Sequence, residues 1–121
     1  MEKIQNSKKY DLEERTLDFA RDVRIFIKKI PKTTANLEDG MQLIRSSGSM
    51  GANYIEANES ISKKDFSFRI KICRKESKES IYWLKLIDIG QNNLLEKDNK
   101  LLINESTELM MIFGAIMRKS E

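Results

Sequence analysis

The apolar residues of this chain recur at alternating spacings of three and four, the period of a helix with one buried face. A first such row follows Asp11, a residue type that caps helices. Its small or apolar members are Leu12, Thr16, Phe19, Val23, Phe26 and Ile30. Pro31 comes next and ends the helix because its ring removes a backbone N–H. The pattern predicts a first helix over residues 12–30.

A second helix is predicted from a cap at Thr33 or Thr34 as far as Glu59. The inward face is expected to consist of Leu37, Met41, Ile44, Gly48, Gly51 and Ile55. An isolated glycine inside a helix costs about 1 kcal/mol relative to alanine. The two glycines on this face therefore predict a close contact with a neighbouring helix, made possible by the lack of side-chain bulk. The alternative is a kink or break near Gly48.

Two more helices complete the expected fold. Ser62 and Asp65 form a capping signal for the third, whose inward face is Phe66, Ile70, Cys73, Ser77, Ser80, Leu84 and Ile87 before Gly90 ends it. The fourth is expected to begin near Asp98, with Leu102, Ser106, Leu109, Phe113 and Ile116 facing inward. Short connections make successive helices antiparallel. The prediction is an all-α, antiparallel up-down-up-down four-helix bundle over residues 11–121, preceded by a flexible N-terminal segment, residues 1–10.

Composition narrows the possible functions. The chain has no histidine and one cysteine, so it lacks the commonest general base and the usual zinc ligands. We therefore expect no catalytic site, no metal and no cofactor. No uncharged apolar run approaches the roughly 20 residues that span a bilayer. A single cysteine fits a reducing compartment, so a cytoplasmic location is expected.

A basic stripe follows the third helix on the side opposite its inward face. It consists of Lys64, Phe68, Lys71, Lys75, Lys78, Tyr82 and Lys85, with Arg74 beside it. Residues 62–88 carry four more basic than acidic side chains, whereas the whole chain has a net charge of only +3. Lysines along a rigid helix can neutralise phosphates, and aromatic rings between them can stack on bases. The alternative is an ordinary solvated helix face.

Extra apolar residues lie beside the inward faces of two helices. The third helix carries Trp83, Ile72 and Ile87 beside its inward face, and the first helix carries Leu17, Ala20 and Ile27 beside its own. Wide apolar faces favour burial against another subunit. The alternative is a thick monomer core with Trp83 at its edge.

Three segments carry a resemblance to a known family: Gln42–Glu59 (QLIRSSGSMGANYIEANE), Lys63–Phe66 (KKDF) and Ile70–Leu84 (IKICRKESKESIYWL). They resemble the four helix bundle proteins, also called 23S ribosomal RNA intervening-sequence proteins, which are encoded within bacterial large-subunit rRNA genes or elsewhere in bacterial genomes. The family name records that location and not an activity. The resemblance implies a ring-shaped homopentamer, similar to the accessory protein of diversity-generating retroelements, which binds nucleic acid and a reverse transcriptase.

Residues that match the family motif are expected to form a buried or interfacial hydrogen-bond network with no catalytic role. They are Arg45, Asn53, Glu56, Glu59, Glu76, Glu79 and Trp83. An ion pair between Glu56 or Glu59 and a basic residue of the third helix is one expected form of it.

Two functions follow as hypotheses. The first is a non-enzymatic homo-oligomer, pentameric by resemblance, that binds nucleic acid, RNA in particular, with low sequence specificity through the basic stripe. The alternative is a scaffold that holds a partner protein such as a reverse transcriptase and has no nucleic-acid affinity of its own.

Overall fold

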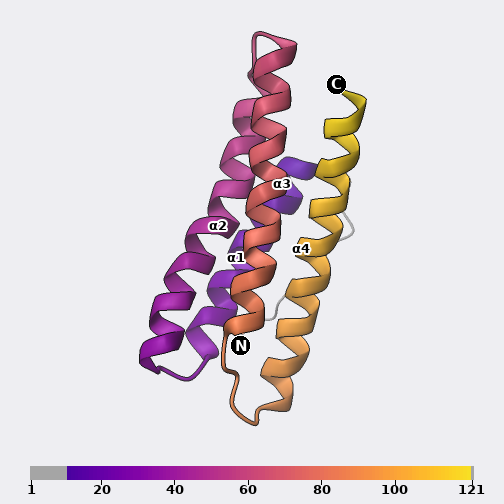
Figure 1. Cartoon of the computed structure of the whole chain (residues 1–121). Coiled ribbons are helices and arrows are strands. Elements are labelled where there is room, and N and C mark those ends of the chain that lie inside the picture. The colour runs from indigo at the N-terminus through magenta and orange to yellow at the C-terminus, as the bar shows by residue number, and fades with distance from the viewer. Residues whose placement is uncertain (1–10, 121) are drawn as a thin grey trace.

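Four helices form the part of the chain that the structure, a computed structural model, describes: residues 11–120. They are α1 (Leu12–Lys29), α2 (Thr34–Asn58), α3 (Lys63–Leu86) and α4 (Asn93–Lys119). Each helix packs against the next, and α4 closes the bundle against α1. Figure 1 shows the up-down-up-down course, with the α2–α3 connection and the C-terminus at one end. The predicted fold class is confirmed, while the predicted flexible segment 1–10 lies outside the described residues.

Polar side chains cap the start of every helix, which satisfies backbone N–H groups that have no partner within the helix. The caps are Asp11, Thr33, Ser62 and Asn92. The start of the fourth helix was predicted wrongly, at Asp98. Asn92 instead accepts hydrogen bonds from the backbone of Leu94 and Leu95, at 3.0 and 3.1 Å, and buried Leu95 anchors the extra turn in the core.

The core lies along the bundle axis and is built from the inward faces predicted for α1, α3 and α4. Its largest fully buried side chains include Phe19, Phe26, Ile70, Leu84, Leu102, Leu109 and Phe113. Asn36 joins the α1–α2 connection to the end of α3. Its amide donates to the carbonyls of Pro31 (2.9 Å) and Asp88 (2.8 Å) and accepts from the Asp88 N–H at 2.9 Å. Asn36 is 2% exposed, and its buried side-chain amide makes these three hydrogen bonds.

The inward face predicted for the second helix was wrong. Leu37, Met41 and Ile55 are 58%, 67% and 50% exposed. The buried row of α2 is Asn36, Gly40, Leu43, Ser46, Ser47, Met50 and Ala57. Both rows have helical spacing, so periodicity alone cannot choose between them. Small side chains decide the rotation, because they let α2 approach α3 closely enough for Ser46 and Ser80 to hydrogen-bond at 2.8 Å.

One of the two glycines on the predicted face of α2 makes the close helix–helix contact that the sequence predicts. A Cβ atom added to Gly51 would lie 2.9 Å from Thr16 Oγ1 and 3.2 Å from Thr16 Cβ, so glycine is what allows α1 and α2 to touch there. At Gly48 the nearest atom to such a Cβ is the end of the Arg24 side chain, at 3.5 Å. The helix runs without a break from Thr34 to Asn58, so the predicted alternative of a break is wrong.

Candidate nucleic-acid interface

The basic stripe lies on the outer surface of α3. All seven of its residues are exposed, including Phe68 at 59% and Tyr82 at 58%. Arg74 is also exposed, and its side chain lies against α4 at Gly114. The stripe therefore presents its charges and rings to solvent in the protomer.

The rotation of α3 is fixed by hydrogen bonds on its inner side. Ser80 bonds Ser46 of α2, and Ser106 of α4 donates to the Ser77 carbonyl at 2.8 Å. Asn99 of α4 donates to the Leu84 carbonyl at 2.9 Å. Because α2 and α4 both hold the inner side, the opposite side of α3 must face outward.

Most of the charges on the stripe have no acidic neighbour. Within residues 11–120, Lys75 is the only stripe lysine with an ion pair, to Glu79 at 3.9 Å. Both partners are substantially exposed, so this pair contributes little. The remaining lysine charges are available to a ligand that carries phosphates.

The motif residues divide into three groups in space. Arg45, Asn53, Glu76 and Glu79 meet on the outer surface between α2 and α3. Arg45 lies 3.9 Å from Glu76 and 3.7 Å from Glu79, and Ser49 donates to Glu76 at 3.0 Å. Asn53 bonds Ser49 at 3.0 Å and accepts from Arg69 at 3.0 Å. This network joins α2 to α3.

Glu76 is the buried member of that network. It is 5% exposed, and its Oε1 atom has no hydrogen-bond partner among residues 11–120, although its Oε2 atom accepts from Ser49. Buried polar atoms are usually satisfied. Within the protomer, the network therefore satisfies one of the two carboxylate oxygens of Glu76.

The other motif residues lie apart from it. Glu56 and Glu59 are exposed at the end of α2, and among residues 11–120 neither forms an ion pair, so the expected pairing with the third helix was wrong. Trp83 is half-buried against the core and contacts Tyr82 edge-on, with ring centroids 5.1 Å apart. Its role at a subunit interface remains a prediction.

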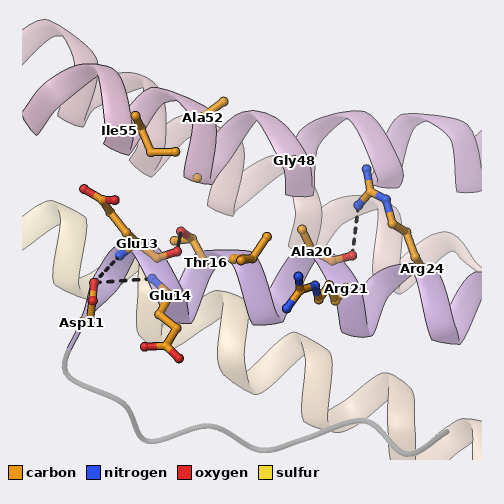
Figure 2. Close-up of a pocket in the computed structure, with 12 residues that line it drawn as sticks. Asp11, Glu13, Glu14, Thr16, Ala20, Arg21, Arg24, Gly48, Ala52 and Ile55 are labelled. Atoms are coloured by element: carbon orange, nitrogen blue, oxygen red, sulfur yellow. Dashed lines mark hydrogen bonds between the residues drawn. The ribbon is translucent and has the colours of Figure 1, made fainter. Parts of the chain in front are cut away.

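An apolar groove between α1 and α2 was missed by the sequence reasoning. Its larger hollow, about 670 Å³, is lined by Leu17, Ala20, Gly48, Gly51, Ala52 and Ile55 together with charged residues of α1. Figure 2 shows Asp11, Glu13 and Glu14 at one end of it. A smaller hollow of about 120 Å³ continues along the same two helices past Ile27, Leu37, Met41 and Ile44 to Lys32.

The reason for the omission is the wrong rotation assigned to α2. The residues expected inside form one wall of the groove instead. The surplus apolar residues of the first helix, Leu17, Ala20 and Ile27, form the other wall. Those three residues were the sequence signal for this surface, since they fall outside the inward face of α1.

A buried ion pair ties α1 to α4. Arg15 donates two hydrogen bonds to Glu105, at 2.7 and 2.8 Å, and one to Glu108 at 2.8 Å. Hydrogen bonding to Glu105 is the main cause that raises the pKa of Arg15, so the guanidinium stays charged. Arg15 and Glu105 are 90 positions apart, and no pattern in the sequence predicts that they form a pair.

The single thiol belongs to the core. Cys73 is fully buried, and burial raises its pKa to about 12. Within residues 11–120, no cluster of three or more acidic or cysteine side chains has an arrangement that could hold a metal ion. None of the helices in that range is long and apolar enough to cross a membrane.

Comparison with known proteins agrees with this architecture. The model of one family, the 23S rRNA-intervening sequence proteins, matches residues 8–115. The chain belongs to that family. The crystal structure of a protein of unknown function from the S23 ribosomal protein family of Bacteroides thetaiotaomicron VPI-5482 is similar, with 27% identity and a TM-score of 0.73. The match covers 88% of this chain and 97% of that one. No curated protein matches.

Proposed function

We propose that this 23S rRNA-intervening sequence protein is a non-catalytic homo-oligomer that binds RNA through the basic stripe of α3. The observation that carries the proposal is the exposure of all five stripe lysines on one rigid helix, four of them without an acidic partner among residues 11–120. A phosphate backbone is the ligand that such a row of ammonium groups fits best.

Binding of this kind has two recognisable properties. Lysine contacts to phosphates carry no sequence information, so affinity should depend weakly on RNA sequence. Each phosphate neutralised on a single strand contributes about −0.7 to the slope of log K against log salt. Several copies of the stripe in one assembly would strengthen the local field and the affinity.

Assembly is proposed to use the α1/α2 groove, with a second copy of this chain as its occupant. The exposed apolar row on α2 spans residues 37–55, a length of about 27 Å at 1.5 Å per residue. Every helix of the bundle has 18 or more residues, so any of them is long enough to cover it. The groove is acidic at the Asp11 end and basic at Lys32, which a second copy can complement. The family resemblance favours a five-membered ring.

The assembly proposal is tested by light scattering on variants whose side chains are already exposed in the protomer. Met41→Glu and Leu17→Glu should lower the mass of the particle while circular dichroism stays unchanged. Trp83→Ala is the comparison, because Trp83 lies outside the groove. A groove variant of unchanged mass would reject the groove, and dissociation by Trp83→Ala alone would move the interface to α3.

RNA binding is tested by fluorescence anisotropy with labelled single-stranded and double-stranded RNA at two salt concentrations. Combined replacement of Lys71, Lys75 and Lys78 by Glu should abolish binding without unfolding the bundle. A matched charge reversal on exposed lysines of α1 and α4 (Lys28, Lys97 and Lys100) controls for the change in net charge. Equal losses in both triple variants would reject the stripe as the specific footprint.

A second candidate function is favoured by the groove itself. If the groove holds a helix of a partner protein, the chain is a scaffold and its basic stripe is an ordinary solvated surface. An intact oligomer that binds no RNA at low salt would support this alternative.

A further inference from the structure

Phe68 stands between two shallow hollows at the end of the bundle where α2 joins α3. One hollow, about 360 Å³, is lined by Lys63, Lys64, Ser67, Phe68, Lys71 and Ser120. The other, about 290 Å³, is lined by Glu56, Glu59, Ser60, Ile61, Asp65, Phe68 and Arg69. Phe68 is the one residue that both share, so its ring separates a basic hollow from a largely acidic one.

One side of the ring already has a partner. The Arg69 guanidinium carbon lies 5.9 Å from the Phe68 ring centroid, within the range of a cation–π contact. Arg69 is itself held by a 3.0 Å hydrogen bond to Asn53 of α2. Arg69 lines only the acidic hollow, which leaves the side of Phe68 toward the lysines open. The Phe68 ring is therefore held in position by Arg69 on one side, yet it is 59% exposed.

The basic hollow combines an aromatic surface with positive charge on both sides. Lys64 precedes Phe68 by one turn of α3 and Lys71 follows it by one turn, about 6 and 4.5 Å along the axis. A ligand that satisfies all three groups needs a flat ring to stack on Phe68 and negative charge on each side of that ring. An unpaired nucleotide within an RNA strand has this chemistry.

We propose that Phe68, Lys63, Lys64 and Lys71 form a stacking subsite for one unpaired base of single-stranded RNA. The inference rests on the proposed function, because it gives the basic stripe a preference among RNA forms. A base in a duplex is already stacked on both faces and cannot present one to Phe68 without unstacking. The carboxylates of Glu56, Glu59 and Asp65 repel phosphates, so the strand lies on the lysine side of the ring.

Tyr82 supplies a matched control within the same stripe. Its ring is as exposed as that of Phe68, 58% against 59%, but it is engaged edge-on with Trp83 and lines neither hollow. Stacking should therefore depend more on Phe68 than on Tyr82.

The test measures binding of single-stranded and double-stranded RNA to wild type, Phe68→Leu and Tyr82→Leu, with 2-aminopurine in the single strand to report stacking. Phe68→Leu should weaken single-strand binding by about 5-fold or more, since base–aromatic stacking contributes about 1–3 kcal/mol by alanine substitution. Duplex binding should change by less than about 2-fold, and Tyr82→Leu should weaken single-strand binding and alter the 2-aminopurine quenching less than Phe68→Leu does.

The outcomes separate this inference from the proposed function. If Phe68→Leu binds like wild type, with unaltered quenching, while the triple lysine replacement abolishes binding, the subsite is rejected and the stripe stands. If wild type binds neither RNA at low salt, both are rejected. Light scattering and circular dichroism on each variant confirm that assembly and folding are intact, as expected for exposed side chains.

Discussion

The buried Arg15–Glu105 pair allows a quantitative test of how α1 is held against α4. Its side chains are 8% and 10% exposed, and two hydrogen bonds of 2.7 and 2.8 Å join them. Replacing Arg15 by Ala removes these bonds and leaves the Glu105 carboxylate without its partner. Breaking a buried pair in this way costs about 3–5 kcal/mol. We expect the lower end, about 3 kcal/mol, because the remaining exposure of Glu105 admits some water.

The assay is urea unfolding followed by circular dichroism, with all variants at one protein concentration because self-association adds to apparent stability. With an m value of about 1.5 kcal/mol/M, the loss corresponds to a midpoint about 2 M lower. Lys100→Ala is the control, since Lys100 and its partner Glu96, 3.2 Å away, have side chains that are 70% and 52% exposed. That exposed arrangement contributes at most about 1 kcal/mol.

A double replacement, Arg15→Met with Glu105→Leu, separates the cost of an orphaned charge from the value of the pair. Apolar replacement of a whole buried pair is often neutral or stabilising. The double variant should therefore recover most of the stability lost in Arg15→Ala. A loss below about 1 kcal/mol for Arg15→Ala, equal to that of Lys100→Ala, would refute the reasoning.

The remaining predictions concern packing, a buried thiol and a buried amide. Gly51→Ala should lower stability by about 1–3 kcal/mol through its clash with Thr16, whereas Gly48→Ala should be neutral or stabilising by up to about 1 kcal/mol, as thermal unfolding will show. The Cys73 thiol, with its pKa raised to about 12 by burial, should resist thiol reagents at pH 8 until urea unfolds the chain. Because the thiol ionises near pH 9 in the unfolded chain but only near pH 12 in the folded one, the free energy of unfolding should fall as the pH rises from about 9 to about 12. Below about pH 9 the thiol is protonated in both states and the stability that it contributes is complete. Cys73→Ala should lack this decline. Asn36→Ala should cost about 1–3 kcal/mol in urea unfolding by removing the three bonds to Pro31 and Asp88.

Much of the fold could be predicted because α1, α3 and α4 each have one dominant apolar row, although only α1 and α3 combine that row with a cap that the sequence pattern identified. Helix α2 is the exception. Its apolar residues Leu37, Met41, Ile44 and Ile55 line the surface groove, while Gly40, Ser46 and Ser47 share the buried row with Leu43 and Met50. Hydrophobicity favours the wrong row there, because the close approach of α2 to α3 depends on small polar side chains that only a tertiary arrangement can assign.

The candidate site was predictable to the extent that it lies on one helix. The basic stripe follows from the spacing of α3 once its inward face is known. The network between Arg45 and Glu76, the Arg15–Glu105 pair and the two walls of the groove each join separate helices. Their formation depends on helix rotation and axial register, which local sequence patterns do not specify.

The most direct test of the central claim is the salt dependence of RNA binding by wild type and by the variant with Lys71, Lys75 and Lys78 replaced by Glu. Anisotropy titrations with single-stranded RNA across a salt series give the slope of log K against log salt. The account predicts binding that weakens with salt, and a slope reduced by about 2, or binding lost altogether, in the variant. Affinity independent of salt, or unchanged in the variant, would contradict it.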